Sequence, residues 1–474
     1  MVRNWLIGVG FVLCSATADA QTYFTDIGYT ALQDRLGAAT PTGAGVSLVQ
    51  VEAPSSGNYR PNTSLSQFSG ITFTDHSTGG STSTHATDVG KYLYGRTNSM
   101  AVGVTQVHLY NANTWLGSEY LNTGTVNAPL VSPGRIQNLS FVGTAANATS
   151  SEALQRLDYA AFTEDTIFVA AVNNGSGTTV PPLFGSSYNA ITVGLTNGGS
   201  SKGTTVFETS GRSKPDLVAP GPNSSNFTSF STPLVASATA LLVETASLKS
   251  DVGEAERAGK LVTIKAALLS GATTDEFASL AEPWTRKTNT SLGFVEPLDR
   301  RFGAGELNIN NSHLILSAAE QSGSDSTLDA TTGWDFETLS TVSETRRYYL
   351  DIPTGQDGTL TATVNWLRPI SGITSTPPTI PTVELRIYEV DSDFNNVTLI
   401  DSSVSTVDNV QHTLTNLTEG HRYAIDVRLA SLADQSSVSY GAAWRTEFTP
   451  VPEPLTVMAF GAVGLVGCRW RFGR

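Results

Sequence analysis

The feature that most constrains this 474-residue chain is an uncharged stretch that follows a pair of hydroxyl residues. Thr228-Ser229 comes after a loop punctuated by glycine and proline, and the residues from Val235 to Val243 are small or apolar, with no charge before Glu244. Such a run predicts a helix that is buried on all sides. A serine at the entrance to this helix would lie beside unpaired N–H groups and the positive end of the helix dipole.

Two interpretations of Ser229 follow from this position. A serine hydroxyl is a good nucleophile only when a base removes its proton, so a catalytic role requires a histidine, an acid that orients it and an oxyanion donor elsewhere in the chain. Alternatively, Ser229 is only an N-cap, the commonest role of serine at a helix start. We place Pro233 in the first turn, where few N–H groups are needed. The local sequence leaves both interpretations open.

The residues around Ser229 carry a family resemblance. The segment KPDLVAPG, from Lys214 to Gly221, is followed by Thr228-Ser229 and then Pro233, and together they resemble the serine block of subtilisin-like serine peptidases, the subtilases. This resemblance implies that Ser229 is the nucleophile. The family usually has Gly-Thr-Ser-Met-Ala before Thr/Ser-Pro-His, and this chain differs at Phe227, Phe230, Ser231 and Leu234.

A candidate acid lies at the end of an expected strand. Residues Gly45 to Glu52 are rich in β-branched side chains and end in a carboxylate, which suits a buried parallel strand with its acid at the carboxyl edge of the sheet. The segment resembles the subtilase strand that carries the aspartate of the triad, and Glu52 takes that position. A dinucleotide-binding fold is excluded because the glycines precede the strand and no G-x-G-x-x-G motif exists.

A candidate base opens the next expected helix. The segment His85-Ala86-Thr87-Asp88-Val89-Gly90-Lys91 resembles the subtilase histidine block, with Asp88 in place of its second histidine. The resemblance implies that His85 is the base, on a helix that continues to Tyr94. His76 is a rival base in a polar loop, but no helical pattern follows it.

Two further segments resemble subtilase elements that contact the substrate. The segment 136–142 resembles the one whose backbone pairs with an extended substrate, which implies substrate contacts at Ser140 and Phe141. An ordinary core strand is the alternative. The strand expected at 167–172 is followed by Asn173, which matches the asparagine whose amide donates to the oxyanion. Asn173 could equally be a turn residue, since Asn-Gly stretches are common in turns.

The resemblance covers roughly residues 23–319, in the order acid, base, oxyanion donor and nucleophile. It implies an α/β fold, a subtilisin-like parallel sheet flanked by helices, for residues 22–320. Helices are also expected at 152–162 and 264–272, and a strand at 188–194. The G-x-S-x-G pattern at 199–203 is treated as a false positive, because that motif requires a strand directly before it and a helix directly after it.

The composition of the chain limits the kinds of ligand and partner that it can bind. Lys and Arg total 28 against 42 Asp and Glu, which gives a net charge of −14 and argues against a nucleic-acid partner. Both cysteines, Cys14 and Cys468, lie in terminal apolar segments, so we expect neither an internal disulfide nor a cysteine metal cluster. No cofactor is expected. Acidic loops could hold calcium, as in many subtilases, but none has a ligand spacing that assigns a metal site.

The pattern changes after a polar linker at 321–328. Short alternating runs separated by Gly, Asp and Asn turns predict an antiparallel β-sandwich at 330–448, similar to the jelly-roll-type modules of secreted peptidases. The expected strands are 348–352, 360–366, 383–388, 422–427 and 439–444. A spacer or stabilising role is the default for this unit, because no charge cluster or aromatic platform marks a ligand site.

Both ends of the chain predict export. Residues 1–20 have Arg3, an apolar stretch and the small-x-small cleavage site Ala18-Asp19-Ala20 of a signal peptide. Only about 25 residues then precede the first expected strand, so self-activation by removal of a longer prosegment is not expected. Residues 449–474 contain Pro452-Glu453-Pro454, a short apolar stretch and terminal arginines.

This C-terminal pattern resembles the PEP-CTERM sorting tails of Gram-negative bacteria. The resemblance implies recognition by an exosortase-type membrane enzyme, contact with the membrane through the C-terminal segment, and a location in the cell envelope or outside the cell. A plain C-terminal transmembrane anchor is the alternative, although about 13 apolar residues are fewer than the roughly 20 of a full span.

The function implied by these features is that of an exported serine endopeptidase, which hydrolyses protein or peptide substrates through a Ser/His/acid triad and an acyl-enzyme intermediate. The alternative is a catalytically inactive subtilase-like surface module with a binding or structural role. The substitutions around Ser229 and the glutamate in place of aspartate motivate this alternative.

Overall fold

The computed structural model describes residues 22–370, 372–373 and 379–451. The predicted signal peptide (residues 1–20) and nearly all of the predicted sorting tail (449–474) lie outside the described residues. Within these ranges, no helix combines the length and the apolar character needed to cross a bilayer.

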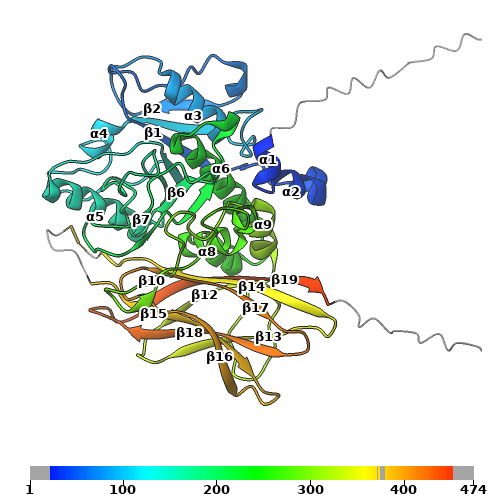
Figure 1. Cartoon of the computed structure of the whole chain (residues 1–474). Coiled ribbons are helices and arrows are strands. Elements are labelled where there is room, and N and C mark those ends of the chain that lie inside the picture. The colour runs from blue at the N-terminus through cyan, green and yellow to red at the C-terminus, as the bar shows by residue number, and fades with distance from the viewer. Residues whose placement is uncertain (1–21, 371, 374–378, 452–474) are drawn as a thin grey trace, which may run out of the picture.

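A seven-stranded parallel sheet forms the centre of the first unit (Figure 1). Its strands follow the spatial order β2-β3-β1-β4-β5-β6-β9, and every neighbouring pair is parallel. The central strands are buried along their whole length, which explains their nearly continuous apolar sequences. The strands are β1 (Ser47–Glu52), β2 (Thr72–Asp75), β3 (Gln106–Asn111), β4 (Ile136–Leu139), β5 (Ile167–Ala171), β6 (Ile191–Leu195) and β9 (Leu217–Ala219).

Helices flank this sheet, and the fold confirms the α/β prediction. The uncharged run forms α6, which contacts strands β4, β5, β6 and β9 and has most of its side chains buried. The described helices are α1 (Thr22–Asp26), α2 (Tyr29–Leu36), α3 (Thr84–Tyr94), α4 (Ala112–Leu116), α5 (Asn147–Glu164), α6 (Thr228–Ser247), α7 (Val252–Ala258), α8 (Leu261–Gly271) and α9 (Ile309–Ser317). Short strand pairs also occur, β7 (Gly203–Thr204) with β8 (Ser213–Lys214) and β10 (Thr288–Asn289) with β11 (Phe294–Val295).

Two four-stranded antiparallel sheets follow and enclose a second core. One sheet has the order β12-β19-β14-β17 and the other β13-β18-β15-β16, and apolar side chains from both sheets meet between them. This arrangement agrees with the predicted β-sandwich. Its strands are β12 (Thr332–Leu339), β13 (Thr345–Asp351), β14 (Gln356–Trp366), β15 (Thr382–Val390), β16 (Asn396–Ser403), β17 (Val410–Leu417), β18 (Arg422–Ser431) and β19 (Val438–Pro450).

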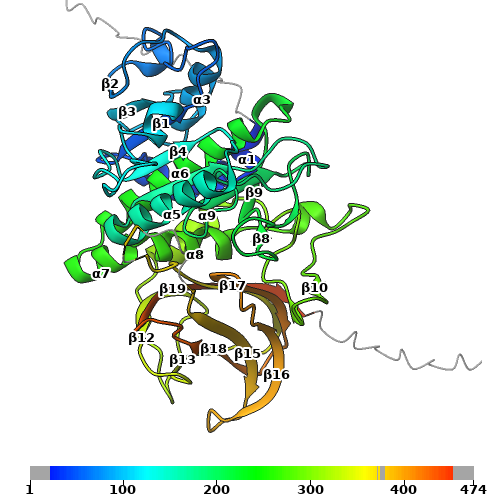
Figure 2. The same ribbon diagram turned by 90° about the vertical axis from the view of Figure 1, so that its left-hand side faces the viewer.

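The sandwich packs directly against the helices of the first unit, as Figures 1 and 2 show. Helix α8 is buried at every position and contacts both β14 and β19. Ser270 on α8 donates a hydrogen bond to the carbonyl of Ala443, at 2.8 Å. The backbone at Gly441 runs so close to α8 that an added Cβ would lie 2.4 Å from the carbonyl of Val262. The two units therefore share a tightly packed, buried junction.

A buried ionic cluster crosses the same junction. Arg368, from the sandwich unit, lies 2.6 Å from Glu208 and 3.3 Å from Asp158, and all three side chains are almost fully buried. The backbone N–H of Arg368 also donates to the side-chain oxygen of Asn189, at 2.7 Å. Buried charges are tolerated only when they are paired and hydrogen-bonded. The sandwich therefore supplies the counter-charge for two carboxylates of the first unit.

Candidate active site

The site residues predicted from the sequence gather at one edge of the parallel sheet. Because the strands are parallel, their carboxyl ends lie at the same edge, where open α/β sheets place their sites. Glu52 is the last residue of β1, Ser140 follows β4, and Asn173 follows β5 by two residues. Helices α3 and α6, which contact each other, bring His85 and Ser229 to this edge from their first turns.

The predicted acid and base are in direct contact. His85 Nδ1 lies 2.8 Å from Glu52 Oε2. A carboxylate can only accept a hydrogen bond, so Nδ1 carries the proton and Nε2 of the neutral ring is left as an acceptor. The Glu52 side chain is 2% exposed, whereas that of His85 is 41% exposed. The acid is therefore buried behind a histidine whose ring reaches solvent.

Opposing effects set the protonation of His85. Burial lowers the pKa of its imidazole, but the hydrogen bond and charge of Glu52, together with the charge of Asp88, outweigh burial and raise the pKa above its ordinary value. His85 is the second residue of α3, and the Ser83 hydroxyl caps this helix by accepting from the N–H of Ala86, at 3.3 Å.

Ser229 is the second residue of α6 and is not its cap. The N-cap is Phe227, which makes no side-chain cap hydrogen bond, so the N-cap interpretation of Ser229 is wrong. Pro233 was expected in the first turn, but it is the sixth residue of the helix and lies beyond that turn. A proline removes the N–H that would bond to the carbonyl four residues earlier, which here belongs to Ser229. The Ser140 hydroxyl donates to that carbonyl instead, at 3.0 Å.

An asparagine that the sequence reasoning missed reaches the start of α6. Asn174 Oδ1 accepts hydrogen bonds from the Thr228 N–H, at 2.8 Å, and from the Thr228 hydroxyl, at 2.9 Å. Its carbonyl oxygen is therefore fixed beside the residue that precedes Ser229, and its NH₂ group must face another direction. The predicted donor, Asn173, binds Ser201 through its main chain, with its N–H 3.0 Å from Ser201 Oγ and its carbonyl 2.7 Å from the Ser201 nitrogen.

Aromatic side chains occupy the space between the histidine and the serine helix. The ring of Phe230, next to Ser229, lies 5.8 Å from the ring of His85, centroid to centroid. Phe227 packs edge-on against Phe230 at 6.0 Å and is 53% exposed. Among the described residues, Ser229 Oγ is not hydrogen-bonded to His85. Catalytic hydrogen bonds are often long without substrate and shorten when it binds.

This geometry agrees with a comparison against protein-family models. The model of the subtilase family matches residues 53–305, which is more than half of the chain. The chain belongs to the subtilase family. The match includes the segments of His85, Asn173, Asn174 and Ser229, and it begins one residue after Glu52. No curated protein sequence matches this subtilase significantly.

Solved subtilisin-like structures are similar to the subtilase only at low sequence identity. Proteases from Pseudoalteromonas arctica are 16% identical, with 60% of this chain and 93% of that chain covered and a TM-score of 0.37. A cold-adapted subtilisin-like serine proteinase is 21% identical, with coverages of 50% and 86% and a TM-score of 0.33. Fervidolysin from Fervidobacterium pennivorans, a keratinolytic enzyme related to subtilisin, is 12% identical, with coverages of 83% and 55% and a TM-score of 0.39.

Other residues singled out from the sequence have different surroundings in this subtilase. His76, the rival base, lies 2.8 Å from His108 and stacks on Tyr110, so its partners are not those of the site. Phe141 packs edge-on against Phe184 at 6.2 Å. The G-x-S-x-G pattern at 199–203 begins four residues after β6 and ends in β7, and the next described element is a strand, which confirms that it is a false positive.

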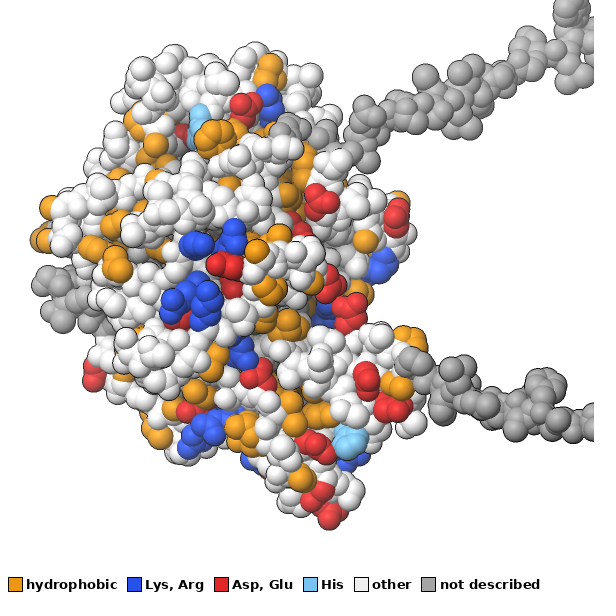
Figure 3. All heavy atoms as spheres, in the orientation of Figure 1, with side chains coloured by type: hydrophobic (Ala, Val, Ile, Leu, Met, Phe, Trp, Pro, Cys, Tyr) orange, Lys and Arg blue, Asp and Glu red, His pale blue; other side chains and the backbone are white. Residues whose placement is uncertain are grey.

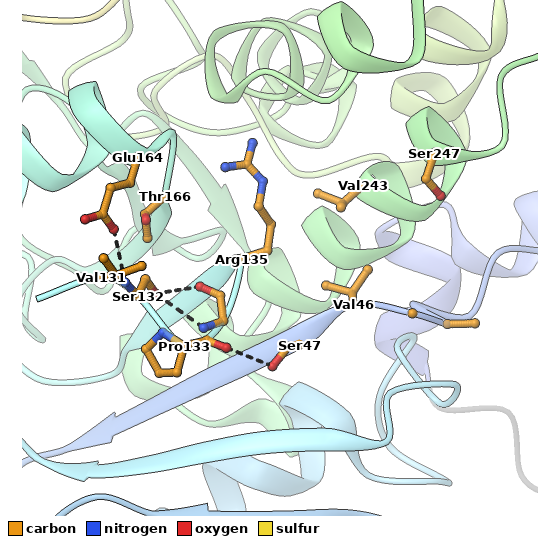
Figure 4. Close-up of a pocket in the computed structure, with 13 residues that line it drawn as sticks. Val46, Ser47, Val131, Ser132, Pro133, Arg135, Glu164, Thr166, Val243 and Ser247 are labelled. Carbon is orange, nitrogen blue, oxygen red and sulfur yellow. Dashed lines mark hydrogen bonds between the residues drawn. The ribbon is translucent and has the colours of Figure 1, made fainter. Parts of the chain in front are cut away.

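A cavity lies at the opposite, amino edge of the sheet and does not belong to the site. It has a volume of about 440 Å³ and is drawn in Figure 4. Two of its polar groups, Glu164 and Ser132, bond to each other, with Glu164 accepting from the Ser132 N–H at 3.0 Å. Arg135, which also lines the cavity, bonds to Asp165 outside the lining, at 2.7 Å. Within the part of the chain that the structure describes, no three His, Cys, Asp or Glu side chains are grouped to hold a metal ion.

Proposed function

We propose that this subtilase is a serine endopeptidase that hydrolyses peptide bonds in protein or peptide substrates through an acyl-enzyme. Ser229 Oγ attacks the carbonyl carbon of the scissile bond while His85 Nε2 accepts the serine proton. His85 then gives this proton to the leaving amine as the C–N bond breaks. Water, deprotonated by the same nitrogen, attacks the acyl-enzyme and releases Ser229 and the carboxylic acid product.

The observation that carries this proposal is the contact between a buried carboxylate and a solvent-exposed histidine, at the edge where α6 presents Ser229. Glu52 accepts from His85 Nδ1–H, which keeps the imidazole in the tautomer whose Nε2 can take the serine proton, and its negative charge stabilises the imidazolium that forms. Glutamate accepts this hydrogen bond as aspartate does. The glutamate in the acid position is therefore compatible with the triad chemistry.

We assign the side-chain oxyanion donor to Asn174 and keep Asn173 as the alternative. The backbone N–H of Ser229, in the unpaired first turn of α6, would be the second donor. Asn174 is supported by the hydrogen bonds that fix its Oδ1 on Thr228, because they hold its amide beside the nucleophile. An oxyanion donor must be held in place before the charge develops, and this anchoring provides that rigidity.

Substrate binding is proposed along the segment that follows β4. An extended peptide would pair with the main chain at Ser140 and Phe141, which gives affinity with little sequence preference. The side chain of Ser140 is already engaged with the Ser229 carbonyl, so this segment is held in register with the nucleophile. On the face in Figure 3, acidic and basic side chains are mixed, which fits protein substrates better than nucleic acid.

Export and sorting to the cell envelope of a Gram-negative bacterium are proposed from the sequence of the two termini alone. The supporting features are the signal-peptide pattern at 1–20 and the Pro-Glu-Pro tail at 449–474, which would be recognised by an exosortase-type enzyme. Fractionation of cells that produce the full chain tests this proposal. Retention of the intact chain in the cytoplasm would refute it.

The activity is tested by labelling the purified protein with a fluorophosphonate probe and by measuring cleavage of a protein substrate. Ser229→Ala should lose both labelling and cleavage while the circular dichroism spectrum stays unchanged. Ser237→Ala is the matched control, because Ser237 is a fully buried serine on the same helix whose hydroxyl donates to the carbonyl of Leu234. Cleavage by Ser229→Ala equal to that of the wild type would refute the assignment, and a wild type that neither labels nor cleaves would support the inactive module.

A further inference from the structure

Behind the Glu52–His85 pair lies a buried polar cluster that the mechanism above does not use. It consists of Gln50 and Tyr94, both of which are 0% exposed. Gln50 Nε2 lies 2.9 Å from Glu52 Oε1 and 2.8 Å from the carbonyl oxygen of Ala86. The Tyr94 hydroxyl donates a hydrogen bond to Gln50 Oε1. Buried polar groups are costly unless they are bonded, and the two amide ends of Gln50 are both satisfied here.

The position of Gln50 follows from strand geometry. Gln50 and Glu52 are two residues apart on β1, so their side chains project from the same face of the sheet. The side chains of glutamine and glutamate have the same length, which brings the amide alongside the carboxylate. Glu52 therefore has each oxygen engaged, Oε1 by Gln50 and Oε2 by His85.

Tyr94 determines which way the amide of Gln50 points. The Tyr94 hydroxyl can donate to Oε1, whereas a flipped amide would place Oε1 against the carboxylate of Glu52 and the carbonyl of Ala86, both of which only accept. Burial, together with the charge of Glu52, raises the pKa of Tyr94 well above its ordinary value, so the hydroxyl keeps its proton. Tyr94 thus holds the Gln50 NH₂ group toward Glu52.

The same cluster connects the acid to the helix that carries the base. Ala86 follows His85 in the first turn of α3, and Tyr94 is the last residue of that helix. One amide on β1 is thereby bonded to both ends of α3. We propose that Gln50 and Tyr94 are positioning residues of the catalytic acid, which hold the longer glutamate side chain of this subtilase in the orientation that contacts His85.

This inference rests on the proposed function, so its test includes a measurement that does not need activity. The pH dependence of kcat/KM reports the pKa of the free base, and nuclear magnetic resonance reports the pKa of the His85 ring directly. Glu52 raises that pKa, so a carboxylate that no longer faces His85 should lower it. The acidic limb of the profile should then move to lower pH while the plateau falls.

Gln50→Ala should lower kcat/KM by about tenfold or more, since a lost hydrogen bond to a charged group costs at least that much. The pKa of His85 should fall by about half a pH unit or more. Tyr94→Phe, which removes a single oxygen atom, should shift both quantities in the same direction by less. The Gln50→Ala/Tyr94→Phe double variant should be no worse than Gln50→Ala, because Tyr94 acts through Gln50.

The matched control is Gln137→Ala. Gln137 is a fully buried glutamine on the neighbouring strand β4, bonded to Trp115 at 3.0 Å and to Ser132 at 2.9 Å. Its loss should lower thermal stability without moving the pKa of His85. A Gln50→Ala variant with an unchanged pKa of His85, or additive effects in the double variant, would overturn the positioning role. A wild type that does not react with the fluorophosphonate probe would refute the proposed function but not the positioning role. The pKa of His85, measured by nuclear magnetic resonance, would still test whether Gln50 holds Glu52 against His85.

Discussion

Replacing Glu52 with the aspartate that is usual in the family should impair this subtilase. The side chain becomes shorter by one C–C bond, about 1.5 Å. Withdrawal along the contact would stretch the 2.8 Å distance between the carboxylate and His85 Nδ1 to about 4 Å, beyond hydrogen-bond range. The same withdrawal would break the 2.9 Å contact with Gln50.

The size of the effect follows from the lost bond. A hydrogen bond that involves a charged group is worth about 1.5–3 kcal/mol. At 1.36 kcal/mol per factor of ten, its loss in the transition state lowers the rate by about 10- to 150-fold. Glu52→Asp should therefore lower kcat/KM by this factor, measured with a fluorogenic peptide and checked by the rate of fluorophosphonate labelling.

A control separates this effect from a general loss of stability. Glu296 is another fully buried glutamate, bonded to Arg300 at 2.6 Å and distant in sequence from the site residues. Glu296→Asp should lower the midpoint of thermal unfolding while leaving kcat/KM unchanged. A Glu52→Asp enzyme as active as the wild type would show that the sheet edge accommodates either acid, and the role of the longer side chain would be refuted.

The remaining predictions concern the oxyanion donor, the sandwich core and the junction. Asn174→Ala should lower kcat by about 10²- to 10³-fold, as expected for an oxyanion donor, and a larger loss with Asn173→Ala would reverse the assignment. Burial raises the pKa of Asp335 to about 7, so the folded state retains a proton that the unfolded chain has released, and stability should fall as pH rises from about 4 to 7. Asp335→Asn should reduce this pH-dependent decline in the free energy of unfolding by up to about 4 kcal/mol, measured by urea unfolding at several pH values. A decline in the variant as steep as in the wild type would contradict the effect. Arg368→Met should lower the free energy of unfolding by about 3–5 kcal/mol, because it leaves two buried carboxylates without a counter-charge. The control Lys260→Met, at the exposed pair with Glu256, should change the free energy of unfolding by less than about 1 kcal/mol.

Much of the first unit could be predicted because its elements have unambiguous patterns. Buried parallel strands have continuous apolar sequences, and the expected bounds of β1 and β5 agree with the observed ones to within two residues and one residue, respectively. The uncharged run predicted the buried part of α6, and the expected helix after His85 ends at Tyr94 as observed. The carboxyl ends of parallel strands share one edge, so the order of the elements predicts that Glu52, His85 and Ser229 lie along that edge.

Other features depend on side-chain directions that local sequence does not reveal. Asn173 and Asn174 are adjacent in the segment after β5, and only the direction of the chain there decides which of them faces Thr228. Strands β12, β16 and β17 were not predicted, and β16 is a mostly exposed edge strand without a buried apolar face. Gln50 drew no attention because a glutamine within an apolar strand has no motif, and its role depends on Tyr94, forty-four positions away.

The ionic cluster around Arg368 means that the peptidase and the sandwich are not exchangeable modules. A chain truncated before β12 would uncover α8 and remove the guanidinium that pairs with Asp158 and Glu208. A first unit fused to a different module would also lack this positive charge, unless the new module placed a cationic side chain beside the two carboxylates. A recombination that separates the two units near residue 330 would therefore have to preserve Arg368 together with Asp158 and Glu208.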